Sequence, residues 1–154
     1  MIQKEKILVY GYGNPGRQDD GLGAALIQKV DEWLTSFPSQ KIITDTNYQL
    51  NIEDAASVSE ASKVVFVDAS IEEIENFTFT EVKASDARVE FSMHAVSPAF
   101  VIDLCTKMYG HAPEAYLLHI KGYEWDFKEE LTPAAQTNLS MAFDFLCDFL
   151  KPYL

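Results

Sequence analysis

Apolar residues along this chain occur either in short continuous runs or in longer stretches with helical spacing. Short runs bounded by glycine or charged residues are typical of buried strands, and spacings of three and four positions form one face of a helix. The runs predict strands at residues 6–10, 41–45, 63–70, 77–84 and 114–122. The helical spacing predicts helices at 22–34, 96–110 and 132–150, and a weaker, shorter one within 53–61.

Several residues mark where these elements begin and end. Pro98 falls in the first turn of its helix, and Gly110 suits a C-terminal cap. Thr132 is the expected N-cap of the last helix, with Pro133 at its first position. The run of four apolar residues from position 64 to 67 predicts the most deeply buried strand, and Asp68 ends it.

Strands and helices therefore alternate through most of the chain. Alternation of this kind predicts right-handed crossovers and an α/β fold, in which a mostly parallel sheet carries helices on both faces. Ligands of such sheets bind beyond the carboxyl ends of the strands. The loops after Tyr10, Asp45, Val67 and Ile120 should therefore lie together.

Composition limits the kinds of function. The 154 residues are 47% hydrophobic and 12% aromatic, which fits one domain spanning 1–154. With 24 acidic and 12 basic residues, the net charge of −12 argues against nucleic acids and anionic membranes as partners. No stretch approaches the roughly 20 apolar residues of a membrane span, and the opening residues read as a strand, so we expect a cytoplasmic protein. Cys105 and Cys147 lack metal-type spacing and are expected to be core thiols.

The stretch VYGYGNPGRQDDGLG, residues 9–23, contains a GxGxxG pattern. The pattern occurs in dinucleotide-binding loops, and Asp45 at the end of the second strand could bind a ribose. Pro15, however, lacks the N–H that a phosphate would use, and Asp19 and Asp20 would place like charge beside it. We therefore rank a site built from carboxylates above a nucleotide site. One of the two aspartates is expected to cap the helix, and the other to point into the crevice.

Two further residues extend this candidate site. Asp68 follows a strand expected to lie beside the first one, which would bring it near Asp20. His94 lies in a polar loop just before a helix, whereas His119 is expected to be packed or at an edge and His111 to be at the surface. Two carboxylates and one imidazole suit zinc, nickel, iron or manganese better than calcium.

The alternating aromatic residues Tyr123, Trp125 and Phe127 allow two interpretations. The simpler one is a continued strand that packs one face on the core. The other is a wall of a substrate groove.

Together these motifs resemble the [NiFe]-hydrogenase maturation proteases over nearly the whole chain. GYGNPGRQDDGLG is similar to the first loop of that family, FVDAS to its third strand, and the segment HAVSPAFVIDLCTKMYGHAPEAYLLHIKGYEWDFKEELTP to the carboxyl-terminal half of one branch. TNYQLNIEDA resembles that branch too, where other branches carry Asp-Gly-Gly-Thr.

The resemblance implies a three-layer α/β/α sandwich of the phosphorylase/hydrolase type. It also implies an endopeptidase that removes the C-terminal extension of a hydrogenase large-subunit precursor after nickel insertion. The metal-recognising positions of the family fall on Asp20, Asp68 and His94. The nickel would be supplied by the substrate, with no permanent cofactor, and we expect the protease to be a monomer.

Three alternatives remain open. A non-catalytic chaperone could hold the nickel-loaded subunit without cutting it. Peptidyl-tRNA hydrolases share a GNPG turn in the first loop, but a protein with a net charge of −12 would repel the phosphates of tRNA. A nucleotide-binding protein is the third.

Overall fold

The computed structural model describes residues 5–84 and 96–154, and within them five strands form one sheet in the order β2-β1-β3-β5-β4. Four neighbouring strands are parallel, and β4 pairs with β5 in the antiparallel sense. The strands are β1 (Ile7–Tyr12), β2 (Ile42–Asn47), β3 (Lys63–Ser70), β4 (Phe77–Val82) and β5 (Glu114–Lys121). The helices are α1 (Leu22–Ser36), α2 (Asp54–Ser59), α3 (Pro98–Tyr109) and α4 (Pro133–Leu150), with short 3-10 turns η1 (Gln18–Gly21) and η2 (Lys151–Tyr153).

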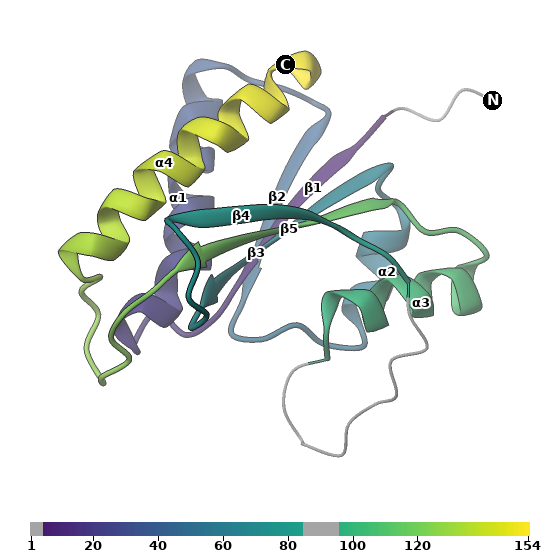
Figure 1. Ribbon diagram of the computed structural model, residues 1–154. Helices are drawn as coiled ribbons and strands as arrows, with labels where there is room; N and C mark the ends of the chain where they lie inside the picture. The colour runs from purple at the N-terminus through teal and green to yellow at the C-terminus, as the bar shows by residue number, and fades with distance from the viewer. Residues whose placement is uncertain (1–4, 85–95) are drawn as a thin grey trace.

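Helices cover both faces of the sheet, so the predicted α/β/α sandwich is confirmed. Figure 1 shows α1 and α4 on one face and α2 and α3 on the other. Each face has its own apolar core, because successive strand residues point to opposite sides. Val9, Val65 and Leu118 pack toward α1 and α4, whereas Tyr10 and Phe66 pack toward α2 and α3.

The helix ends agree with the sequence signals. Thr132 Oγ1 accepts a hydrogen bond from the backbone N–H of Ala135 at 3.2 Å and so caps α4. Gly110 ends α3 in the left-handed conformation, with φ of 73°, which costs glycine little. Ser97, which the sequence signals did not single out, caps the start of α3. None of the helices in the described part of the chain is long and apolar enough to cross a membrane.

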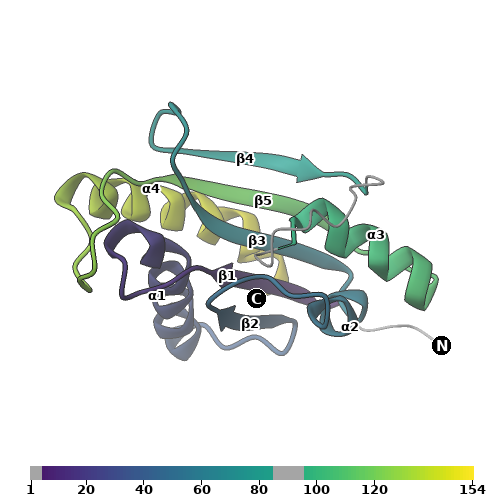
Figure 2. The same ribbon diagram turned by 90° about the horizontal axis from the view of Figure 1, so that it is seen from below.

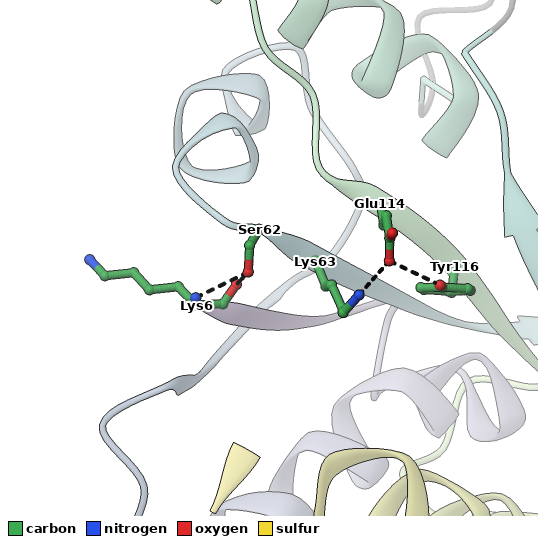
Figure 3. A network of polar contacts seen from close by, with 5 residues as sticks. All are labelled: Lys6, Ser62, Lys63, Glu114 and Tyr116. Carbon is green, nitrogen blue, oxygen red and sulfur yellow. Dashed lines mark hydrogen bonds and ion pairs between the residues drawn. The ribbon is translucent and has the colours of Figure 1, made fainter. Parts of the chain in front are cut away.

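Polar contacts at the amino ends of the strands fix how β1, β3 and β5 align. Lys63 on β3 forms an ion pair with Glu114, its register partner on β5, and the Tyr116 hydroxyl also donates to Glu114 (Figure 3). The Ser62 hydroxyl, just before β3, exchanges hydrogen bonds with the Lys6 backbone before β1. With this register, Asp68 lies opposite His119 at the carboxyl edge.

Close packing of α1 against the sheet depends on Gly23. A Cβ at this position would lie 2.7 Å from the Tyr12 carbonyl oxygen and 2.8 Å from that of Val67. The missing side chain thus lets the first turn of α1 touch the ends of β1 and β3. This contact brings the loop between β1 and α1 to the carboxyl edge of the sheet.

Two differences between the predicted and the observed elements bear on the candidate site. The first strand runs to Tyr12, so the glycine-rich pattern begins inside β1 instead of after it. The predicted strand at 114–122 ends at Lys121, and the aromatic stretch beyond it is not a strand. Figure 2 shows this stretch leaving the sheet between β5 and α4.

Candidate active site

A cavity of about 500 Å³ opens at the carboxyl edge of the sheet, beyond β3 and β5. Three acidic residues line it, Asp20, Asp68 and Glu72, together with Ser70, His119 and one basic residue, Arg17. Ala69, Ile71 and Trp125 complete the lining. The cavity thus collects groups from the first loop, from the end of β3, from β5 and from the loop after β5, as expected for a parallel sheet.

Asp68 lies near the end of β3, with its side chain 29% exposed. The pKa of its carboxyl is raised from 3.8 to about 7, mainly by burial and in part by the nearby Asp20 carboxylate, whereas polar contacts with the Ala69 backbone and the Tyr12 hydroxyl lower it. The Asp68 carboxyl is therefore poised between its neutral and charged forms near neutral pH. A cation in the cavity would favour the charged form.

The side chain of Asp68 has a neighbour on each adjoining strand. The hydroxyl of Tyr12, at the end of β1, lies close enough to the Asp68 carboxylate to lower the pKa of Asp68. Burial raises the pKa of Tyr12 well above its ordinary value, so this hydroxyl keeps its proton. On the other side, His119 Nε2 lies 4.0 Å from Asp68 Oδ2.

Asp20 reaches the cavity from η1. Its Oδ2 accepts a hydrogen bond from the backbone N–H of Asn14 at 2.8 Å, which closes the first loop on itself. The loop passes very close to the η1 backbone, because a Cβ on Gly13 would lie 2.1 Å from the Asp20 carbonyl oxygen. Gly13 also has a φ of 136°, a conformation that only glycine adopts readily.

Asp19, the residue before Asp20, is fully buried and does not line the cavity. Its carboxylate accepts from the backbone N–H groups of Tyr123, Glu124 and Thr132 and from the Thr132 hydroxyl, at 2.7 to 3.1 Å. The expectation that one of the two aspartates caps the helix is therefore wrong. Gly21 is the N-cap of α1, with no side-chain cap, and Asp19 instead ties the first loop to the segment after β5.

This hydrogen bonding explains why the aromatic stretch does not continue β5. The Asp19 and Gln18 side chains accept hydrogen bonds from the backbone N–H groups of residues 123, 124 and 126. These N–H groups are therefore not available to a neighbouring strand. Tyr123 and Phe127 are 46% and 88% exposed, so the interpretation as a strand packed on the core is wrong. Trp125 lines the acidic cavity, and Arg17 bonds to its carbonyl oxygen while lying over the Phe127 ring. These positions fit the other interpretation, in which the aromatic stretch forms a wall of a substrate groove.

The structure thus brings together two of the three predicted site residues, Asp20 and Asp68. His94, the third, lies outside the described residues. His119 lines the same cavity although its strand position suggested a packed or edge residue; the signal that identifies it is its register with Asp68. In residues 5–84 and 96–154, no three His, Cys, Asp or Glu side chains are grouped closely enough to hold a metal ion.

A second cavity, of about 310 Å³, lies where the first loop meets the end of β2. It is lined by Gly13, Pro15, Ala24, Thr46, Asn47 and Tyr48. Tyr48 is 72% exposed there. The first loop therefore contributes to an acidic cavity and to a second, uncharged one.

Three solved structures with a similar fold are described as hydrogenase maturation enzymes. The structure is similar to the [NiFe] hydrogenase maturation protease HycI from Thermococcus kodakarensis KOD1, with a TM-score of 0.74 and 18% identity over 95% of this chain and 92% of that one. The hydrogenase maturating endopeptidase HybD from E. coli gives 0.71 and 16%, over 96% and 93% of the two chains. A hydrogenase 2 maturation peptidase from Thaumarchaeota archaeon SCGC_AB-539-E09 gives 0.68 and 15%, over 95% and 98%.

The sequence matches no protein-family model and no curated protein. The likeness is therefore one of fold, and the fold is that of the [NiFe]-hydrogenase maturation proteases over nearly the whole chain.

Proposed function

We propose that this protein is an endopeptidase that removes the C-terminal extension of a [NiFe]-hydrogenase large-subunit precursor after nickel insertion. The observation that supports this most directly is the shared cavity of Asp20 and Asp68, which come from segments 48 positions apart. The cavity belongs to a chain with the fold of proteins described as hydrogenase maturation proteases.

In this proposal the nickel belongs to the substrate. Asp20, Asp68 and His94 engage a nickel ion that the precursor already holds, so that cleavage follows metal insertion. Carboxylate and imidazole donors suit a first-row divalent metal. The cation would also relieve the repulsion between the two carboxylates and favour the charged form of Asp68, whose pKa is raised to about 7.

The reaction is hydrolysis of one peptide bond, in which water adds to the carbonyl carbon and the amide nitrogen leaves with a proton. Two routes are compatible with the residues of the cavity. The substrate's nickel can polarise the scissile carbonyl or the attacking water. Alternatively, one of the two aspartates can accept the proton of that water as a general base.

The extension would lie along the carboxyl edge of the sheet. The acidic cavity and the uncharged cavity beside Tyr48 both border the first loop, so a chain crossing this loop can occupy both. Trp125 and Ile71 offer apolar contacts beside the carboxylates. An acidic cavity also favours a partner whose cleavage region carries positive charge, including the nickel itself.

The direct test uses Asp20→Ala, Asp68→Ala and His94→Ala with nickel-loaded and nickel-free precursor. We expect the wild type to shorten only the nickel-loaded precursor and each variant to lose at least 100-fold in rate, in line with the loss of a catalytic electrostatic group. Glu72→Ala, which removes another carboxylate from the same cavity, is the control for the loss of charge alone. Processing at the wild-type rate by all three variants would reject the assignment.

The strongest rival is a chaperone that holds the nickel-loaded subunit without cutting it. Mass spectrometry of the large subunit before and after incubation with the purified protein separates the two. A constant mass together with stable complex formation would favour the chaperone, whereas loss of a C-terminal fragment would favour the protease.

A further inference from the structure

Asp68 lies in the middle of a row of three side chains that crosses three adjacent strands. In the β1–β3 register Gly11 pairs with Val67, which brings the next residue, Tyr12, beside Asp68. In the β3–β5 register Asp68 pairs directly with His119. Because side chains alternate along strands, all three point to the sheet face covered by α2 and α3.

The two neighbours contact Asp68 in different ways. Tyr12 is only 8% exposed and belongs to the apolar core, and the nearby Asp68 carboxylate helps to raise the pKa of its hydroxyl. His119 lies on the cavity side, 24% exposed, with Nε2 at 4.0 Å from Asp68 Oδ2. One side of the carboxylate is thus bordered by a buried hydroxyl, and the other by an imidazole that can donate or accept.

We propose that Tyr12 and His119 are positioning residues, which hold the Asp68 carboxylate in the orientation that engages the metal of the substrate. This inference rests on the proposed function and adds two residues that act through Asp68. Groups that surround a metal-binding carboxylate help to fix its orientation, and loss of such an outer partner typically lowers metal affinity 10- to 100-fold.

The chain offers a matched control for Tyr12. Tyr10 lies two positions earlier on β1, points to the same face and is fully buried, but its hydroxyl donates to Asp54 at 2.8 Å. Tyr10→Phe and Tyr12→Phe therefore each remove one buried hydroxyl from one strand. Only the second removes a partner of Asp68.

The test measures Ni²⁺ binding by calorimetry and, in parallel, the KM and kcat for nickel-loaded precursor. We expect Tyr12→Phe to weaken Ni²⁺ binding and to raise KM by 10- to 100-fold, while Tyr10→Phe binds Ni²⁺ as the wild type does. His119→Phe keeps the ring but removes its nitrogens and should weaken binding as well. His119→Gln, which restores a polar group, should recover part of the affinity, and His111→Gln at an exposed position should change nothing.

Melting temperatures separate positioning from loss of structure. A positioning role predicts that Tyr12→Phe and Tyr10→Phe melt within a few degrees of one another while only Tyr12→Phe loses affinity. If Asp68→Ala abolishes Ni²⁺ binding and both Tyr12→Phe and His119→Phe bind as the wild type does, the positioning role is refuted and the proposed function stands. If Asp68→Ala itself binds Ni²⁺ normally, the metal role of Asp68 fails, and the positioning role fails with it.

Discussion

Asp19 and Thr132, which are 113 positions apart, are joined by two hydrogen bonds. Asp19 Oδ1 accepts from the Thr132 backbone N–H at 2.9 Å, and Oδ2 accepts from the Thr132 hydroxyl at 2.8 Å. The same hydroxyl oxygen caps α4 through Ala135. The first loop and the start of the last helix are therefore one hydrogen-bonded unit, and Asp20 is attached to it as the next residue.

Asp19→Ala should strongly destabilise the fold. It leaves three backbone N–H groups and a threonine hydroxyl without their acceptor. The two donors of Thr132 are buried, where an unsatisfied group is most costly. We expect a loss of about 3 kcal/mol or more in the free energy of unfolding, measured by denaturant titration.

Substitution of the neighbouring residue, Asp20, should affect stability much less than Asp19→Ala. Asp20→Ala removes one hydrogen bond to Asn14 at the edge of the cavity, so it should change stability by about 1 kcal/mol or less. It should nevertheless abolish processing. Equal destabilisation by the two substitutions would show that the buried hydrogen bonds of Asp19 do not hold the loop.

Asp68 should make the fold less stable as the pH rises. Its folded pKa of about 7 lies above the unfolded value of 3.8, so between these values the folded state binds more protons than the unfolded state. Stability from this group is fully present below pH 4 and is lost progressively up to about pH 7. Asp68→Asn lacks this loss, so it should be more stable than the wild type at pH 8 by on the order of 1–3 kcal/mol, with little difference at pH 4.

Thermal unfolding of both proteins from pH 4 to pH 8 measures this difference. Asp148→Asn, at a 74% exposed position on α4, removes the same charge from the surface and serves as the control. An Asp68→Asn advantage that is independent of pH would contradict the raised pKa. The same substitution should impair processing, since a neutral amide is a poorer partner for a cation.

Gly23→Ala should disturb the contact between α1 and the sheet. The new methyl group would meet three backbone atoms within 2.9 Å, at Tyr12 and Val67, and backbone cannot move aside as a side chain can. We expect a loss of about 1–3 kcal/mol in the free energy of unfolding, with reduced activity, because the ends of β1 and β3 shift relative to each other.

Gly16→Ala is the matched substitution in the same glycine-rich stretch, residues 9–23. A Cβ there approaches only the Asn14 side chain, at 3.2 Å, so the change should stay within about 1 kcal/mol. Similar stabilities of the two alanine variants in denaturant titration would contradict the packing role of Gly23.

The layers of the fold were predictable because each depends on a local pattern. The short apolar run before Asp68 is typical of a buried strand, and Thr132 with Pro133 marks a helix start by its own chemistry. The length of β1 and the irregular path of residues 122–131 depend instead on distant partners. The acceptor for the backbone of Tyr123 is Asp19, more than 100 positions earlier, and no local signal encodes that pairing.

The candidate site was likewise predictable only in part. Asp20 and Asp68 could be named because both follow strands expected to end at one edge of a parallel sheet. His119 could not, because a single histidine in a strand reads as a packed residue until the register pairs it with Asp68. The residue pattern alone did not decide which of the two adjacent aspartates faces the cavity; the family resemblance indicated Asp20, and Asp20 lines the cavity in the structure.

The GxGxxG pattern in the first loop also allows a nucleotide-binding protein as an alternative. In the structure the protein itself fills the space beside two of these glycines. A Cβ on Gly11 would lie 2.4 Å from the Gly23 carbonyl oxygen, and one on Gly13 would lie 2.1 Å from that of Asp20. A phosphate on this loop would also approach the Asp20 carboxylate, to which the Asn14 N–H already donates.

ATP, GTP and NAD at millimolar concentration should therefore leave the melting temperature unchanged. A ligand present at 100 times its Kd would instead add about 2.7 kcal/mol of stability, which a thermal melt detects easily. A rise of several degrees with any of the three would show that the loop binds nucleotides, and the carboxylate site would then need a different explanation.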